Sequence, residues 1–182
     1  VVDDDFPILI SDRTPASATT GEDLEFIVTY SDNVGITSAY AEFWFGTGTR
    51  QTADFDLETG DLSIPIPSGS TSTLHYILHF MDAGGNTLVT NQRDVKIIDN
   101  DLPQVLSDSS PVEANTGEEI KFSFELTDNV RVASAILEYW TGSSSKHFMS
   151  PLVQANGNYT LDPMVPTDSV SDINYILLLA YP

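Results

Sequence analysis

The sequence predicts an all-β protein built from two tandem antiparallel β-sandwiches, and three observations lead to this prediction. Residues 3–46 align without a gap on residues 99–142, an offset of 96 residues, with 19 of the 44 positions identical. Apolar and polar residues alternate with the period of two that strands show, and no segment has a clear helical period. Turn residues follow at short intervals. A repeat of this length is a whole domain, so we expect sandwiches at 1–98 and 99–182.

The first repeat is expected to hold seven strands, and each is bounded by turn residues. In 23–31, for example, Leu24, Phe26 and Val28 point one way, and polar residues point the other. The intervening turns contain Gly, Asn, Asp or Pro, which supply the backbone angles that turns need. The predicted strands of this repeat are 7–12, 23–31, 37–45, 50–57, 61–66, 73–81 and 87–98.

The second repeat follows the same plan up to its sixth strand, at 172–180. A longer loop before this strand raises the offset, so that Tyr76 corresponds to Tyr175. The sequence contains no counterpart of the seventh strand, and Asp3–Pro7 matches Asp99–Pro103, where the repeats join. These features predict a fragment of a longer array. We expect the free edge of 172–180 to be covered by another strand, or the second repeat to be less ordered than the first.

Composition excludes several classes of function. The formal net charge of −20 disfavours nucleic acids and anionic lipids as partners. The absence of cysteine excludes disulfides, thiolate metal sites and a cysteine nucleophile. No apolar stretch is long enough for membrane insertion. Nucleophile-elbow, phosphate-loop and HExxH motifs are also missing, so the sequence predicts no enzyme activity.

The acidic turns are the strongest chemical feature. In a strand order that runs up and down, the first residues and alternate turns share one end of each sandwich, and they carry most of the Asp and Asn side chains. Oxygen ligands from several loops are what Ca²⁺ requires. The alternative is that these residues simply form turns on an acidic surface. The predicted calcium ligands are Asp5, Asp32 and Asp82 in the first repeat, with Asp101 and Asp128 in the second.

An aromatic stripe on the third strand of each repeat is a second candidate site. Tyr40 and Trp44 are predicted to face outward, opposite Ala39, Ala41 and Phe43, and Trp140 repeats the position of Trp44. Such a face offers flat contact area for a glycan or a protein. The alternative is that both tryptophans pack against neighbouring strand or loop residues.

Two short segments resemble the immunoglobulin-like tandem repeats of bacterial and archaeal surface proteins. They are Asp32–Ile36 before a strand and the later turn Asp82–Asn86. Tyr76 and Tyr175 are similar to the tyrosine corner of such sandwiches. The linker Asp99–Pro103 more weakly resembles the calcium-binding linkers of cadherins. The resemblance implies two immunoglobulin-like or fibronectin-III-like sandwiches, the second without its last strand, in an extracellular stalk or adhesin.

The expected function is therefore a non-enzymatic spacer or adhesive stalk of a secreted or cell-surface protein, stiffened by calcium. Its partners would be proteins or glycans at the cell surface and further repeats of the same chain. One alternative is a carbohydrate- or protein-binding module that uses the aromatic stripe. Another is an accessory segment of an exported hydrolase.

Overall fold

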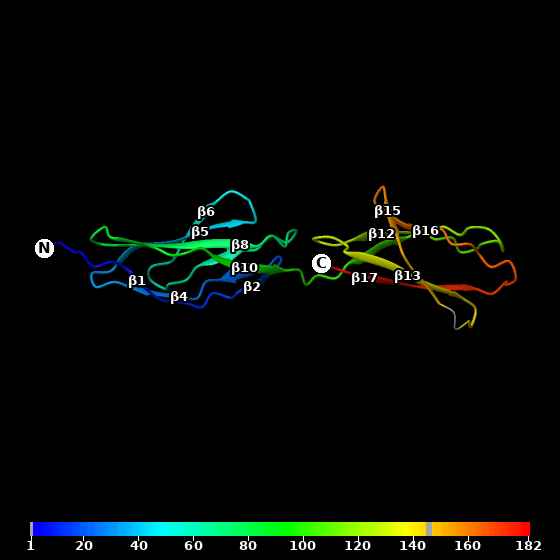
Figure 1. The fold of residues 1–182 in the computed structure, drawn as a ribbon, viewed down its shortest axis with the longest axis horizontal. Coiled ribbons are helices and arrows are strands. Elements are labelled where there is room, and N and C mark those ends of the chain that lie inside the picture. Colours follow the sequence, from blue (N-terminus) through cyan, green and yellow to red (C-terminus); the bar gives the residue numbers. More distant parts are fainter. Residues whose placement is uncertain (1, 145–146) are drawn as a thin grey trace. The chain divides into compact units, whose positions relative to one another are not determined.

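The structure is a computed structural model that describes residues 2–144 and 147–182, and it confirms the all-β prediction (Figure 1). The chain divides into two compact units, unit 1 at Val1–Asp99 and unit 2 at Asn100–Pro182. Secondary structure in the described ranges consists of strands, turns and bends. Within these ranges there is no helix of the length and apolarity needed to cross a membrane.

Unit 1 contains ten strands. Six of them form the larger sheet, in the order β2-β10-β8-β5-β6, with β9 also paired to β8. The others form two short antiparallel pairs, β1-β4 and β3-β7. The strands are β1 (Ile8–Asp12), β2 (Ser17–Thr19), β3 (Asp23–Glu25), β4 (Val28–Ser31), β5 (Ile36–Phe45), β6 (Gln51–Asp54), β7 (Ser63–Pro65), β8 (Leu74–Asp82), β9 (Thr87–Val89) and β10 (Arg93–Ile98).

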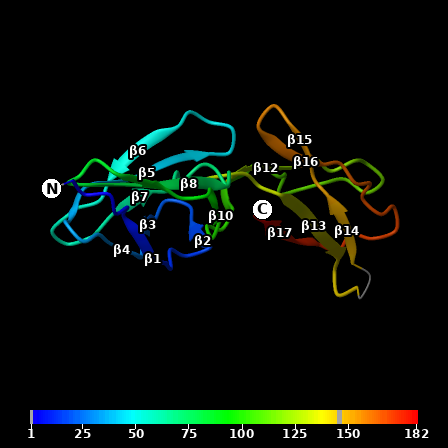
Figure 2. The same ribbon diagram turned by 60° about the vertical axis from the view of Figure 1, so that its left-hand side comes forward.

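The core of unit 1 lies between these sheets. Alternate residues of β8, including Leu74, Tyr76 and Leu78, are buried, as the period-two pattern predicts. Val95 and Ile97 of β10 belong to the same core. In Figure 2, β10 lies beside β2, and the two strands pair in parallel while β10 also pairs antiparallel with β8. The strand β10 therefore closes one side of the sandwich.

Two long predicted strands are each divided in the structure. The segment 23–31 pairs first with β7 and then with β1, so it contributes to two sheet pairs as β3 and β4. The segment 87–98 is divided into β9 and β10, which pair with different ends of β8. The strand β2 was not predicted from the sequence, because its three residues carry no clear alternation.

The described residues of unit 2 form seven strands in two sheets, of order β11-β12-β16-β15 and β14-β13-β17. Its core contains Phe122, Phe124 and Leu137. The turn between β15 and β16 has positive φ at both Asn156 and Gly157, which suits a tight hairpin. The strands are β11 (Gln104–Asp108), β12 (Phe122–Thr127), β13 (Ser134–Thr141), β14 (Phe148–Pro151), β15 (Val153–Ala155), β16 (Asn158–Leu161) and β17 (Ile173–Ala180).

Two strand pairs have equivalent registers in the two units. The pair β11-β12 repeats the β1-β4 pairing at an offset of 96, including the irregularity after Leu9 and Val105. Phe43 lies opposite Tyr76, and Tyr139 lies opposite Tyr175, so the offset of 99 for the sixth strand is also seen in space. The sequence repeat therefore corresponds to a structural repeat.

Candidate metal centre and aromatic face

The turn before β5 fixes the first carboxylate of the candidate metal centre. The Oδ1 atom of Asp32 accepts backbone hydrogen bonds from Val34 at 2.9 Å and from Gly35 at 3.1 Å. Asp and Asn commonly stabilise turns in this way. The carboxylate is thereby held in one orientation, with its second oxygen left for another partner.

The turn after β8 fixes the second carboxylate. Asp82 is only 2% exposed, and its oxygens accept hydrogen bonds from the backbone N–H of Asn86 at 2.8 Å and from its amide at 2.9 Å. Desolvation opposes the charge on Asp82, but the hydrogen bonds from Asn86, Gly85 and Gly84 outweigh it, so the pKa of this carboxyl is below its ordinary value. Asp82 is therefore ionised at neutral pH.

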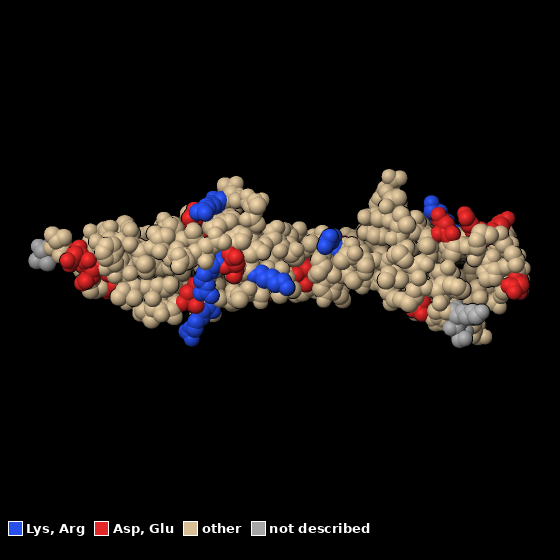
Figure 3. All heavy atoms as spheres, in the orientation of Figure 1, with Lys and Arg blue, Asp and Glu red and all other residues tan. Residues whose placement is uncertain are grey.

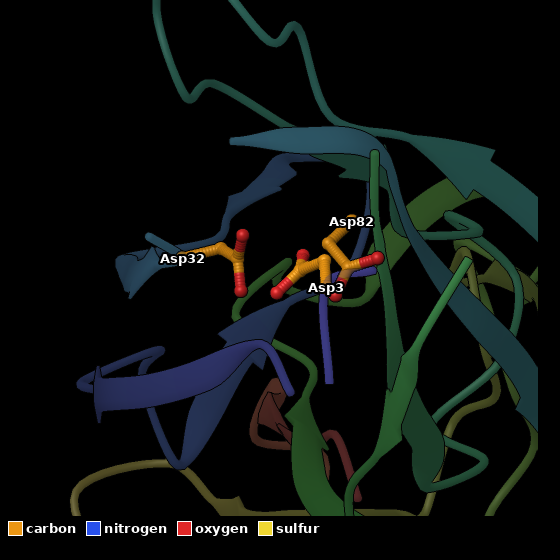
Figure 4. Close-up of side chains that lie close together, drawn as sticks. All are labelled: Asp3, Asp32 and Asp82. Carbon is orange, nitrogen blue, oxygen red and sulfur yellow. The ribbon is translucent and has the colours of Figure 1, made fainter. Parts of the chain in front are cut away.

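The third carboxylate comes from the first residues of the chain. Asp3 offers an oxygen that lies with oxygens of Asp32 and Asp82 in a group whose members are all within 4.8 Å of one another. Figure 4 shows the three carboxylates pointing toward one another, with Asp3 between the other two. Ligands on opposite sides of one Ca²⁺ are separated by about 4.6–5.2 Å, since each lies at about 2.3–2.6 Å from the ion. The spacing therefore suits a single bound cation.

Two of these carboxylates have an oxygen with no partner in the described part of the chain. The Oδ2 atoms of Asp3 and Asp32 are shielded from solvent and accept no hydrogen bond there. Three like charges at this spacing repel one another, and shielding from water strengthens the repulsion. Figure 3 shows acidic atoms gathered at this end of unit 1, with no Lys or Arg beside them on the face in view. A cation would supply the missing partner for both oxygens.

Asp5, a predicted ligand, lies beside this group rather than in it. Its carboxylate accepts a hydrogen bond from the Asn33 amide at 3.0 Å, and its backbone carbonyl accepts one from the Asn86 amide at 2.8 Å. The same two amides also reach Asp3, at 3.5 Å from its carboxylate and 3.3 Å from its backbone carbonyl. The neighbouring Asp3 takes the position that the sequence assigned to Asp5.

In unit 2 the predicted ligands are only partly assembled. Asp128 repeats the Asp32 turn, with Oδ1 accepting from Val130 at 2.9 Å and Arg131 at 2.7 Å, while its Oδ2 is shielded from solvent. Among the described residues, no group of three carboxylates includes Asp128 or Asp101. The offset of 99 places Tyr181 where unit 1 has Asp82, so the third carboxylate is missing from the sequence.

The predicted aromatic stripe is largely covered in unit 1. Trp44 is only 8% exposed, because the Arg50 guanidinium lies 4.1 Å from the centre of its ring and also forms an ion pair with Glu42. Tyr40 stacks on His79, with ring centres 4.6 Å apart. These contacts use the ring faces that a ligand would need.

The aromatic face of unit 2 is covered in a similar way. Trp140 stacks on His147, with ring centres 4.5 Å apart. His147 also pairs with Glu138, a contact that the sequence did not reveal. The stacking in both units agrees with the alternative that the tryptophans pack against neighbouring residues.

The similarity of this chain to known proteins is low. No protein-family model and no curated protein matches the chain. Solved structures that resemble it include the FN1–FN3 domains of chicken CNTN1, at 11% identity, 97% coverage of this chain, 66% of that chain and a TM-score of 0.37. The D00–D0 domain of intimin matches at 10% identity, with 94% and 98% coverage and a TM-score of 0.33.

A chimeric titin Z1Z2 tandem also matches, at 11% identity, 95% coverage of this chain, 96% of that chain and a TM-score of 0.34. The strands of the chain itself show the all-β fold that the sequence predicts.

Proposed function

We propose that the chain is a non-enzymatic tandem immunoglobulin-like segment of a secreted or cell-surface protein, and that it acts as a spacer or adhesive stalk stiffened by Ca²⁺. The observation that carries this proposal is the group formed by Asp3, Asp32 and Asp82. An adhesive role would involve protein or glycan partners and further repeats of the same kind.

The position of the carboxylates explains how calcium would stiffen unit 1. Asp3 belongs to an extended segment without strand pairing, whereas Asp32 and Asp82 belong to turns of the sandwich. A shared ion would fasten this segment to both turns and remove the repulsion among the three charges. Carboxylate oxygens from several separate segments suit Ca²⁺, whose coordination geometry is adaptable, better than the smaller and stricter Mg²⁺.

The test is calorimetry of the full chain after EDTA treatment, with Ca²⁺ or Mg²⁺ added back. A ligand at 100 times its Kd stabilises the folded state by about 2.7 kcal/mol, so the unit 1 transition should rise by roughly 10 °C or more. Asp32→Asn should remove most of this rise. Asp4→Asn, which removes the same charge from an exposed neighbour of Asp3, should preserve it.

A second variant tests the geometry without removing a ligand. A Cβ atom on Gly84 would lie 2.8 Å from the Asp3 Cβ and 2.9 Å from its Oδ2, so Gly84→Ala must displace Asp3. We expect this variant to fold and to bind Ca²⁺ more weakly. An unchanged melting temperature of the unsubstituted chain at millimolar Ca²⁺ would contradict the proposal and would mean that the carboxylates only stabilise turns.

A further inference from the structure

Unit 2 contains a groove in the position that β10 occupies in unit 1. The groove has a volume of about 560 Å³. One wall includes Glu113, Ala114 and Asn115, and the opposite wall includes Ile173 and Tyr175. At offsets of 96 and 99, these residues correspond to β2 and to the start of β8. The two walls are therefore the counterparts of the two strands that flank β10.

The pairing of β10 shows what such a groove receives. Lys96 to Ile98 pair in parallel with β2, and Arg93 to Val95 pair antiparallel with β8. Val95 and Ile97 are 1% and 3% exposed, so their side chains complete the core of unit 1. In unit 2, the described residues provide no strand that does this for β17, which pairs only with β13.

Equivalent residues show the consequence for the core of unit 2. Tyr76 is 1% exposed in unit 1, whereas Tyr175 is 37% exposed in unit 2. The segment 113–115 is not a strand, although its counterpart β2 is one. Part of the Tyr175 side chain, whose counterpart is buried beside β10 in unit 1, is therefore exposed along the groove, next to an edge of β17 that has no strand partner among the described residues.

The charges around the groove specify one further property of its occupant. In unit 1, Tyr76 donates a hydrogen bond to Asp12 at 2.7 Å, and Arg93 of β10 forms an ion pair with the same carboxylate at 2.7 Å. In unit 2, Tyr175 donates to Asp108 at 2.5 Å. The described residues supply no cation to Asp108, and Glu113 and Asp172 add negative charge to the groove.

We propose that this groove is a strand-acceptor site. Its occupant is an added β-strand with a cationic residue followed by β-branched aliphatic residues two and four positions later, the pattern of Arg93, Val95 and Ile97. The strand lies antiparallel to β17 and parallel to residues 113–115. Its cation pairs with Asp108, and its two aliphatic side chains enter the groove beside Tyr175. Main-chain hydrogen bonds supply affinity, and alternate side chains supply selectivity.

The experiment adds a synthetic peptide of residues 87–98 to the full chain and follows hydrogen exchange of individual amides by NMR. The expected result is saturable protection of alternate amides of β17. A peptide with Asp in place of Val95 and Ile97 should give no protection, because it would place carboxylates in the core. A peptide with Met in place of Arg93 should bind about tenfold more weakly, equivalent to about 1.4 kcal/mol.

A matched change in the chain separates pairing at Asp108 from general charge attraction. The Asp108→Asn chain should bind the original peptide and the Arg93→Met peptide equally. The Asp168→Asn chain, changed at an exposed site outside the groove, should keep the tenfold difference between the two peptides. Equal binding of all peptides to the original chain would overturn the proposal. The proposal would also be overturned if the β17 amides were protected without peptide in a concentration-dependent dimer, since a second copy would then fill the groove.

Discussion

The two units have equivalent registers in two strand pairs and differ in how the sandwich is closed. In unit 1, β8 is paired on both edges, because β5 lies on one side and β9 and β10 lie on the other. In unit 2, the matching strand β17 pairs only with β13 in the described structure. Tyr76 and Tyr175 make the same hydrogen bond to an Asp side chain, yet only Tyr76 is buried. The burial of a residue is therefore set by the strand beside it as well as by its own position in the pattern.

The units also differ in the carboxylates around one equivalent turn. Asp32 and Asp128 form the same turn, with the same backbone hydrogen bonds. In unit 1, the turn after β8 supplies Asp82 and Asn86 beside it. The group of unit 1 therefore depends on the turn after β8 as well as on the repeated turn.

The largest effect is expected from opening the closed side of unit 1. Val95→Asp removes a fully buried side chain, worth about 1.5–3 kcal/mol, and places a carboxylate in the core. We expect unit 1 to lose at least about 3 kcal/mol and to expose Tyr76, so that it behaves like unit 2. Thermal unfolding monitored at β5 and β8 measures this change.

Lys96→Asp is the matched control, because Lys96 lies on the same strand and is exposed. Exposed substitutions usually change stability by less than about 0.5 kcal/mol. A loss as large as that of Val95→Asp would mean that strand pairing or charge, rather than core burial by β10, determines the stability of unit 1.

A smaller effect is expected from removing the two equivalent tyrosine hydroxyls. Hydrogen bonds to charged groups contribute about 1.5–3 kcal/mol, and the partner of Tyr76, Asp12, has a side chain that is only 5% exposed. Tyr76→Phe should therefore cost unit 1 about 2 kcal/mol. Tyr175→Phe should cost unit 2 less, because water can replace the lost donor at Asp108. Equal losses in chemical denaturation would contradict the difference in burial.

Acid should affect unit 1 more than unit 2. Burial opposes the charge of Asp12, but hydrogen bonds from Tyr76 and Thr14 and the nearby Arg93 outweigh it, so the pKa is below the ordinary value of 3.8. A lowered folded pKa adds stability that is present above the unfolded value and is lost as pH falls toward the folded value. Unit 1 should therefore weaken below about pH 4.

The pKa of Asp108 is also below its ordinary value, through Ser110 and Tyr175 acting against desolvation, but without an Arg93 counterpart among the described residues. Chemical denaturation between pH 2 and 6 should show the larger loss of stability in unit 1. Asp12→Asn should reduce that excess without abolishing it, because Asp82 of unit 1 also has a lowered pKa. A steeper loss in unit 2 would contradict this assignment.

The sequence was sufficient to predict the sandwich because the alternation along 73–81 and the repeat at 96 residues are set by burial on one strand face. It did not reveal β2, whose pairing with β10 depends on a distant segment. It also assigned Asp5 rather than Asp3 to the carboxylate group, since both are acidic and the amides of Asn33 and Asn86 contact both residues. The burial of Trp44 also depends on a contact outside its own strand, because Arg50 lies in the turn between β5 and β6.

Hydrogen exchange of the unmodified chain, without peptide, tests the difference between the units most directly. Amides of β8 are paired on both edges of the strand, and those facing away from β13 in β17 have no strand partner in the described structure. We predict slow exchange throughout the centre of β8 and fast exchange at alternate residues of β17. Uniformly slow exchange along β17 in a monomeric chain would show that unit 2 is closed after all and would contradict the comparison.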